Sequence, residues 1–205
     1  MGFYSTHVLP RLLDLSCGVG PITHQRRKVV PHARGEVVEI GIGSGLNLPF
    51  YDAAKVASVI GVDPDTHLWA RGAERARAAD FPVEHRALSG EALPLDSGSA
   101  DTVVVTYALC TIADPVAALR EMARVLRPGG EILFTEHGRA PDAGVARWQA
   151  RIDPVWKRIA GGCHSGRDIP ALFRQAGLEF AWMDEMYIPG PKVLAYNYWG
   201  AARRP

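Results

Sequence analysis

Residues 37–45 read Val-Val-Glu-Ile-Gly-Ile-Gly-Ser-Gly, a mostly β-branched run that ends in three alternating glycines. The run predicts a buried parallel strand, and Gly41, Gly43 and Gly45 predict a tight turn whose backbone can approach a ligand closely. Glu39 falls inside the strand, where a carboxylate is costly unless a cationic or donor-rich group pairs with it. The stretch therefore favours a ligand-binding turn, although a glycine triplet alone also fits a purely structural one.

The composition of the 205 residues fits one globular domain, because 47% are hydrophobic and 22% are charged. The formal net charge of +1 gives no electrostatic footprint for nucleic acid, so no nucleic-acid partner is expected. The basic cluster at residues 26–28 is interpreted as a solvated helix face.

The three cysteines, Cys17, Cys110 and Cys163, are widely spaced and form no C-x-x-C pair. This pattern argues against a disulfide framework and a zinc ribbon, so we expect buried thiols, no metal and a reducing compartment. Arg11 and Asp14 interrupt the first apolar stretch, and no run of 18 apolar residues occurs. We therefore expect no transmembrane segment and a soluble, cytoplasmic protein.

Strand-like and helix-like segments alternate along most of the chain. We expect two short N-terminal helices, of which Pro31 ends the second, then strands at 37–40, 56–62, 83–88, 101–107 and 131–136, and helices at 51–55, 65–79, 113–126, 145–160 and up to residue 175. Runs at 178–186 and 192–199, joined by Pro-Gly-Pro, predict a terminal antiparallel hairpin. Asp65 or Thr66, Asp114, and Ser165 or Asp168 are expected to begin helices as N-caps. This order implies an α/β fold with a doubly wound, mostly parallel sheet.

Polar residues gather where the expected strands end, and ligands of such sheets bind at the carboxyl ends of the strands. Asp63 follows the second strand, about 20 residues beyond the glycines, where a carboxylate can accept hydrogen bonds from ribose hydroxyls. The same edge is expected to carry residues 89–92, 106–110 and 136–138.

These motifs together resemble the class I S-adenosylmethionine-dependent methyltransferases. The resemblance rests on Glu-Ile-Gly-Ile-Gly-Ser-Gly at 39–45, Asp63, Glu-Ala-Leu-Pro at 91–94, Asp-Thr-Val-Val-Val at 101–105 and Val-Leu-Arg-Pro-Gly-Gly at 125–130. It implies a Rossmann-like seven-stranded sheet and S-adenosyl-L-methionine as cofactor, with S-adenosyl-L-homocysteine as product. We further expect a helical segment at 1–34 that either caps a ligand cleft or only packs on the sheet, a cofactor-binding core at 35–138, and acceptor-side helices with the hairpin at 139–205.

A narrower resemblance, to the methyltransferase-like protein 7 group of thiol S-methyltransferases, rests on the segments at 107–111, 135–137, 162–164 and 196–202. It implies a small-molecule acceptor, preferably a thiol. A phospholipid or other small-molecule N- or O-methyltransferase remains an alternative, as do a non-catalytic binder of a nucleoside cofactor and an NAD-dependent oxidoreductase. Leu46 weakens the last alternative, because a dinucleotide fingerprint has its third glycine at that position.

The resemblance assigns site residues to two groups. On the acceptor side, His137 is the first candidate for a base or acceptor-orienting group, Glu136 the second, and Tyr107 lines the target; His164 beside Cys163 is the runner-up. The glycine backbone would approach the methionine moiety, Glu39 its amino group, Asp63 the ribose, and residues 89–92 the adenine. The expected cofactor-binding residues are Glu39, Gly41, Gly43, Gly45, Asn47, Asp63, Pro64, Ser89, Gly90, Glu91, Ala92 and Thr106.

Overall fold

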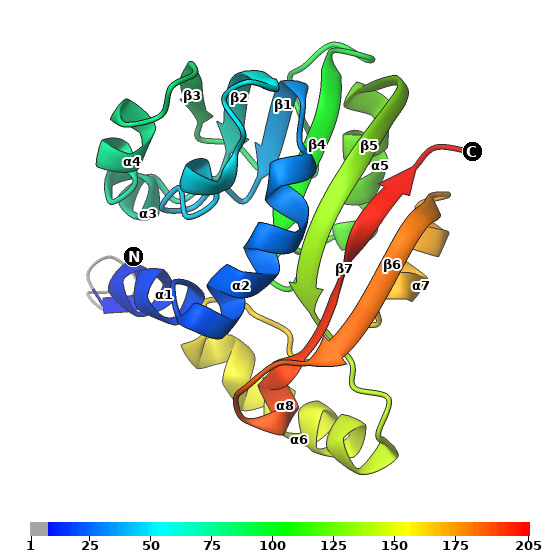
Figure 1. The fold of residues 1–205 in the computed structure, drawn as a ribbon. Helices are drawn as coiled ribbons and strands as arrows, with labels where there is room; N and C mark the ends of the chain where they lie inside the picture. The colour runs from blue at the N-terminus through cyan, green and yellow to red at the C-terminus, as the bar shows by residue number, and fades with distance from the viewer. Residues whose placement is uncertain (1–7) are drawn as a thin grey trace.

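The computed structural model describes residues 8–205, which form one mixed seven-stranded sheet with helices packed around it (Figure 1). The strands are β1 (Gly35–Ile40), β2 (Val56–Val62), β3 (Val83–Arg86), β4 (Ala100–Thr106), β5 (Leu126–His137), β6 (Glu179–Tyr187) and β7 (Tyr196–Arg203). Their order is β3-β2-β1-β4-β5-β7-β6, and β7 runs antiparallel to both of its neighbours. The expected doubly wound sheet with a terminal antiparallel hairpin is confirmed.

Eight α-helices and two 3₁₀-helices connect or precede the strands in the described part of the chain. They are α1 (Leu9–Cys17), α2 (Gly20–Val29), η2 (Val30–His32), η3 (Leu48–Phe50), α3 (Thr66–Ala70), α4 (Ala73–Arg77), α5 (Pro115–Val125), α6 (Ala143–Ile159), α7 (Ile169–Gln175) and α8 (Lys192–Ala195). Across residues 8–205, no helix is both long and apolar enough to span a bilayer.

The sheet buries both of its faces because successive side chains of a strand point to opposite sides. On β1, Val37 packs in the core that includes Val29 of α2, whereas Val38 packs in the core that includes Leu119 of α5 and Phe173 of α7. Each of these side chains is at most 3% exposed. The continuous valine and isoleucine runs of the sequence therefore correspond to central, doubly covered strands.

Aspartates begin three of the helices, as expected. The carboxylate of Asp65 accepts from the backbone N–H groups of His67 and Leu68, and Asp114 and Asp168 cap α5 and α7 in the same way. Each cap satisfies a backbone donor that the first helical turn leaves without a partner.

The predicted single helix at 65–79 is wrong, because the chain forms α3 and α4 with a break at Gly72. A Cβ atom at Gly72 would lie 2.5 Å from the carbonyl oxygen of Ser44, so the break lets the backbone press against the glycine turn. The predicted helix at 51–55 is also wrong: η3 lies earlier, and the N–H of Lys55 closes a turn onto the carbonyl of Asp52.

Strands β7 and β5 begin at other residues than predicted. Residues 192–195 form α8, so the expected strand at 192–199 instead runs from Tyr196 to Arg203. Strand β5 begins at Leu126, five residues before the expected start, because Leu126 pairs with Ala100 across a register shift. In both cases the start of the strand is set by pairing with a strand that is remote in the sequence, which local sequence patterns do not show.

Candidate active site

A hydrogen bond holds the glycine turn after β1 against Asp63 at the end of β2. Gly41, Gly43 and Gly45 have φ angles of +72°, +52° and +71°, a region that L-residues with a side chain rarely adopt. The N–H of Gly43 donates to Oδ2 of Asp63 at 2.9 Å, while Oδ1 accepts from the N–H of Asp65 at 2.8 Å. Burial raises the pKa of Asp63, although these two hydrogen bonds favour its charged form.

Glu39 lies behind the turn in a buried hydrogen-bond network. Its carboxylate is 1% exposed and accepts from Nδ2 of Asn47 at 2.9 Å and from the hydroxyl of Tyr51 at 2.7 Å. Burial raises the pKa of Glu39 to about 7, while the hydrogen bond from Tyr51 and the charge of Arg26 oppose that increase. Asn47 also donates to Oγ1 of Thr106 at 2.9 Å, so the network joins the ends of β1 and β4.

Arg26 is a site residue that the sequence analysis missed. The interpretation of residues 26–28 as a solvated face is wrong for Arg26, which is 5% exposed. Its Nη1 donates to Oδ1 of Asn47 at 2.9 Å and to Oγ1 of Thr106, and its guanidinium carbon lies 5.2 Å from the centre of the Tyr107 ring. Its buried Nε atom has no hydrogen-bond partner among residues 8–205. The fold thus places a cation beside the glycine turn.

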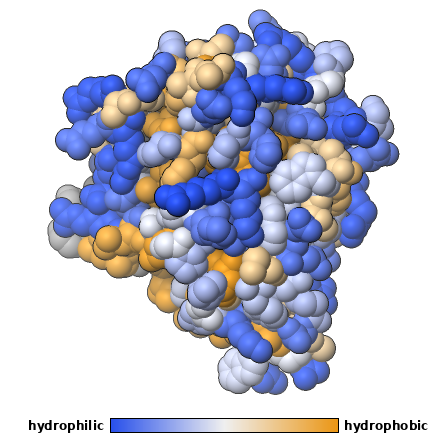
Figure 2. Space-filling model, viewed as in Figure 1, coloured by the Kyte–Doolittle hydropathy of each residue, from blue (hydrophilic) through white to orange (hydrophobic). Residues whose placement is uncertain are grey.

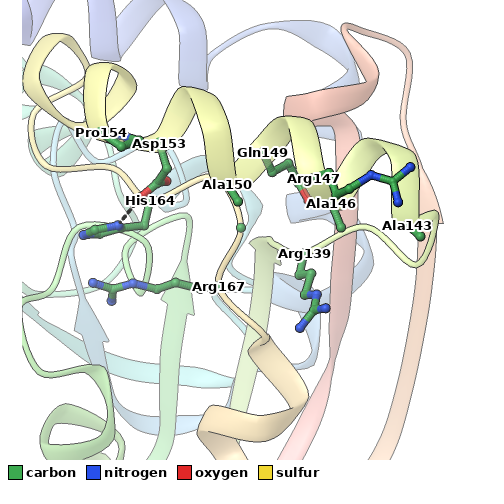
Figure 3. Close-up of a pocket in the computed structure, with 11 residues that line it drawn as sticks. Arg139, Ala143, Ala146, Arg147, Gln149, Ala150, Asp153, Pro154, His164 and Arg167 are labelled. Atoms are coloured by element: carbon green, nitrogen blue, oxygen red, sulfur yellow. Dashed lines mark hydrogen bonds and ion pairs between the residues drawn. The ribbon is translucent and has the colours of Figure 1, made fainter.

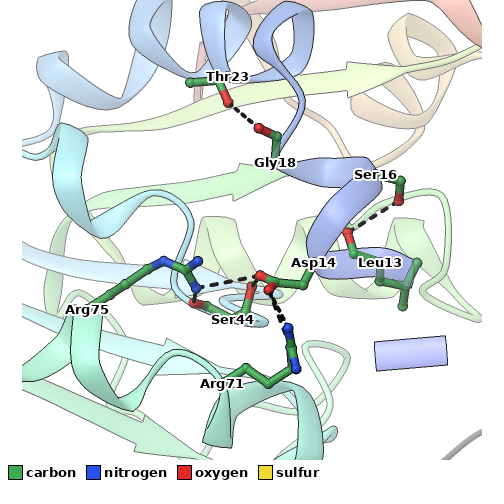
Figure 4. Close-up of polar contacts among 8 residues, drawn as sticks. All are labelled: Leu13, Asp14, Ser16, Gly18, Thr23, Ser44, Arg71 and Arg75. Carbon is green, nitrogen blue, oxygen red and sulfur yellow. Dashed lines mark hydrogen bonds and ion pairs between the residues drawn. The ribbon is translucent and has the colours of Figure 1, made fainter. Parts of the chain in front are cut away.

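A cavity of about 130 Å³, called here the glycine-turn cavity, lies between this turn, the end of β4 and α1. Helix α1 is fastened over it by Asp14, whose carboxylate accepts from Ser44 at 2.5 Å and pairs with Arg71 at 2.9 Å and Arg75 at 3.5 Å (Figure 4). The lining includes Arg26, Gly41, Gly43, Ser44, Asp63, Thr106 and Tyr107.

The expected cofactor-binding residues divide into those that line this cavity and those that lie elsewhere. Gly41, Gly43, Asp63 and Thr106 are in the lining. In the loop at 89–92, Ser89 donates to Glu91, which accepts from the N–H of Asp114 at 2.7 Å. The expected residues outside the lining are Glu39, Gly45, Asn47, Pro64, Ser89, Gly90, Glu91 and Ala92.

Tyr107 separates the glycine-turn cavity from a second one. It has a φ of +53°, and no other non-glycine residue between positions 8 and 205 has a positive φ. Such a conformation costs energy and is found most often at functional sites. The Tyr107 hydroxyl donates to Oδ1 of Asn197 at 2.6 Å, and its ring stacks on His137 at a centroid distance of 6.4 Å. Burial raises the pKa of Tyr107.

The second cavity, called here the apolar cavity, has a volume of about 440 Å³ and lies among α1, α2 and α6. Hydrophobic side chains also gather on the outer surface over α1 (Figure 2), where Leu12 and Leu15 are 49% and 69% exposed. Leu13, Cys17, Tyr107 and Thr111 line both cavities, so the two adjoin. The apolar lining includes Leu9, Leu12, Ile22, Trp156, Ile188 and Leu194.

Cys110, His137 and Cys163 meet on the wall of the apolar cavity, with their ligand atoms within 4.8 Å of one another. Sγ of Cys163 lies 3.3 Å from Nε2 of His137. A hydrogen bond from the Cys110 thiol, and then the neighbouring His137, lower the pKa of Cys163 to about 4, against the effect of burial. Burial lowers the pKa of His137, but its contact with Cys163 outweighs this and raises it overall. From the sequence we expected buried thiols and no metal here, because the members of the cluster come from three separate segments with no ligand spacing between them.

Glu136 faces the loop after β4. Its side chain is fully buried, and Oε1 accepts from the N–H groups of Ala108 and Leu109 at 2.9 and 3.0 Å. Burial raises the pKa of Glu136 to about 7, although these N–H groups favour the carboxylate. Glu136 therefore holds the backbone that carries Tyr107 and Cys110.

Known proteins share both the sequence motifs and the fold. Residues 38–134 match the family described as Methyltransferase domain. The chain is 31% identical to thiol S-methyltransferase TMT1B of Rattus norvegicus over 169 residues, which cover 77% of this chain and 68% of that protein. It is 34% identical to phosphatidylethanolamine N-methyltransferase of Cereibacter sphaeroides over 62% of this chain and 66% of that protein. A methyltransferase structure from Bacillus halodurans superposes with a TM-score of 0.73 at 14% identity, covering 91% of this chain and 100% of that one.

The fold and the strand-end residues define a class I methyltransferase. The chain belongs to the S-adenosylmethionine-dependent methyltransferases, and S-adenosyl-L-methionine is its cofactor. The site fits this group, because the buried cation of Arg26 suits a carboxylate, and the turn at Gly41 and Gly43 lines the cavity without side chains that would block close approach. The alternatives of an oxidoreductase and a non-catalytic binder are not supported by these relatives, all of which are methyltransferases.

Proposed function

We propose that this methyltransferase acts on small apolar thiols. The observation that carries the proposal is the apolar cavity, which adjoins the glycine-turn cavity at Tyr107 and has two cysteines and a histidine on its wall. Similarity to thiol S-methyltransferase TMT1B supports the same acceptor class.

On the cofactor side, Arg26 would bind the carboxylate of the methionine moiety and Asp63 the ribose hydroxyls, while Gly41 and Gly43 allow close approach of the backbone. Glu39 would act through Asn47 and Arg26, because both of its oxygens already accept hydrogen bonds. When bound, the cofactor supplies a methyl group that is electrophilic because it is attached to a sulfonium. The adenine would extend toward residues 89–92.

On the acceptor side, a thiol needs little help from a base because its unperturbed pKa of about 8.5 is close to neutral pH. His137 is the group that would orient the acceptor sulfur or accept its proton, and its ring faces both the cavity and Tyr107. Glu136 would support this arrangement through the loop at Ala108 and Leu109. Methyl transfer then depends chiefly on bringing sulfur and methyl carbon into line.

The test measures methyl transfer from labelled cofactor to alkyl thiols of increasing chain length, with alcohols and amines of the same alkyl groups as matched acceptors. We expect thiol methyl ethers as products and a KM that falls as the chain lengthens, because each buried methylene contributes about 0.8 kcal/mol. Asp63→Ala serves as the inactive control. Faster labelling of the amines, or a KM independent of chain length, contradicts the proposal.

A phospholipid acceptor is the second candidate, and a separate cavity of about 690 Å³ under α6 favours it (Figure 3). Arg139, Arg147 and Arg167 line this cavity, and guanidinium groups bind phosphate well. His164, beside them, pairs with Asp153 at 2.7 Å. No residue between positions 8 and 205 lines both this cavity and the apolar one, which is why the thiol is preferred. Labelling of phosphatidylethanolamine vesicles would reverse that preference.

A further inference from the structure

The cluster of Cys110, His137 and Cys163 is held together from three directions. Cys110 lies in the loop after β4, His137 ends β5, and Cys163 follows α6. The N–H of His164 donates to the carbonyl of Cys110 at 2.9 Å, which ties the α6 segment to the β4 loop. The backbone thus brings two sulfurs and an imidazole nitrogen together without a disulfide.

We propose that Cys110, His137 and Cys163 bind a zinc ion whose fourth position takes the acceptor sulfur as a thiolate. This inference rests on the proposed function, because it assigns the chemistry that holds the thiol. It also assigns a role to His137, whose Nε2 is a zinc ligand. The acceptor thiol then needs no general base to lose its proton.

The donor set and its spacing fit zinc. Two thiolates and one imidazole suit zinc better than magnesium or calcium, which prefer oxygen ligands. With Zn–S of about 2.3 Å and Zn–N of about 2.0 Å, tetrahedral geometry separates ligand atoms by roughly 3.5–3.8 Å. The observed separations, 3.3 Å for the Cys163–His137 pair and at most 4.8 Å within the cluster, bracket this spacing. Small side-chain movements would complete the site.

The position of the cluster leaves room for a fourth ligand. All three side chains line the apolar cavity, so a thiol entering that cavity meets them directly. Three protein ligands plus one open position is the pattern of catalytic zinc sites, whereas structural sites use four protein ligands. Cys17, Tyr107 and Thr111 line both cavities, so a thiol held by the cluster would lie in the cavity that adjoins the glycine turn.

The charges of the zinc ion, its three thiolate ligands and the cofactor sulfonium balance. Two cysteine thiolates neutralise the zinc ion, and the acceptor thiolate adds one negative charge to a poorly hydrated cavity. The positive sulfonium of the cofactor offsets that charge across Tyr107, which reduces the cost of placing ions in an apolar environment.

The transfer is balanced in atoms and electrons. The thiol loses its proton to solvent on binding, and its sulfur then forms the new bond to the methyl carbon. The carbon–sulfur bond of the sulfonium breaks, and its electron pair stays on that sulfur as a neutral thioether. The methylated product is a weaker zinc ligand than the thiolate, so transfer favours its release.

The test measures bound metal in the full chain, purified without chelators and supplied with zinc. We expect about one zinc per chain and none in Cys163→Ser or Cys110→Ser. The matched control is Cys17→Ser, which removes a third thiol from the same cavity and should keep the metal. Calorimetric binding of S-adenosyl-L-homocysteine to each variant shows that the fold is intact.

Cobalt substitution supplies a readout that does not depend on turnover. We expect thiolate-to-cobalt charge-transfer absorption and tetrahedral d–d bands, with the d–d bands shifting when an alkyl thiol is added but not when the matching alcohol is added. Absence of these bands, or metal binding that survives Cys163→Ser in a folded protein, overturns the proposal. So does thiol methylation at an undiminished rate in demonstrably metal-free protein.

The two proposals fail in different ways. If metal-free protein methylates thiols, the zinc site is wrong and the thiol function stands. If the metal binds and responds to thiols but only amines or phospholipids are methylated, the site is real and the proposed function is wrong.

Discussion

The glycine-turn cavity and the apolar cavity meet at Tyr107, yet they are built by different means. The first is made of backbone turns and buried polar side chains at the ends of β1, β2 and β4. The second is lined by side chains of α1, α2, α6 and α8 and by residues at the ends of β4 and β5. On the proposed function, cofactor recognition depends mainly on the sheet edge, whereas acceptor choice depends also on the helices around it. Four substitutions test this division.

Asp63→Ala should have the largest effect, because Asp63 both anchors the glycine turn and would bind the ribose. Loss of two hydrogen bonds to a charged group costs on the order of 4 kcal/mol, so the Kd for S-adenosyl-L-homocysteine should rise about 10³-fold. Calorimetry measures this change. The control is Asp65→Ala, which removes the α3 cap two residues away and should lower stability while changing the Kd little. Equal effects of the two substitutions would contradict the assignment.

Glu39→Gln should change the pH dependence of stability in the cofactor-free protein. The folded pKa of about 7 lies above the ordinary glutamate value of 4.5, so the folded state retains a proton that the unfolded state releases. Stability should therefore fall as pH rises from about 4.5 to about 7, by on the order of 3 kcal/mol at 1.36 kcal/mol per pKa unit.

Urea unfolding at several pH values checks this prediction, because Glu39→Gln should remove that part of the slope. Glu136, with its own pKa of about 7, keeps a similar contribution. An unaltered slope in Glu39→Gln would show that the Glu39 carboxylate does not retain its proton.

Arg26→Met should weaken cofactor binding by about 30-fold, which corresponds to about 2 kcal/mol for a lost charge-assisted hydrogen bond. The KM for the cofactor should rise, while the order of preference among thiols stays the same. Arg27 is the matched control because it is exposed on the same helix and its guanidinium faces the Phe50 ring. If Arg27→Met has the same effect, general electrostatics rather than a specific contact explains the loss.

Ile22→Ala should have the smallest effect and should act on the other cavity alone. Ile22 lines the apolar cavity but not the glycine-turn cavity, so about 1 kcal/mol of acceptor binding should be lost. The KM for long alkyl thiols should rise about five-fold, and the cofactor Kd should not change. A change in cofactor affinity would show that the two cavities are not independent.

The sequence predicted the strand-end residues of the glycine-turn cavity better than the residues that helices and loops bring to either cavity. Strand ends in a parallel sheet converge on one edge, so Gly41, Gly43, Asp63 and Thr106 could be grouped from local pattern alone.

Arg26 was missed because its burial depends on α2 packing across the sheet, which no local pattern encodes. The grouping of Cys110, His137 and Cys163 was not expected, because these residues lie on a loop, a strand end and a segment after a helix and so show no local ligand spacing. The expectations of a cytoplasmic location and of no nucleic-acid partner stay predictions.

The fastening of α1 by Asp14 has a kinetic consequence. Asp14 is held by Ser44 and by two arginines whose side chains are 36% and 34% exposed, so solvent ions reach these pairs. At an ionic strength of 0.15 M the screening length is about 8 Å, and it shortens further as salt is added. Leu13, Asp14 and Cys17 of α1 line the cavity from which, on the proposed function, spent cofactor would leave. Ionic strength is therefore expected to set the rate at which the enzyme exchanges product for fresh cofactor, while the affinity of the apolar cavity for its acceptor stays nearly independent of salt.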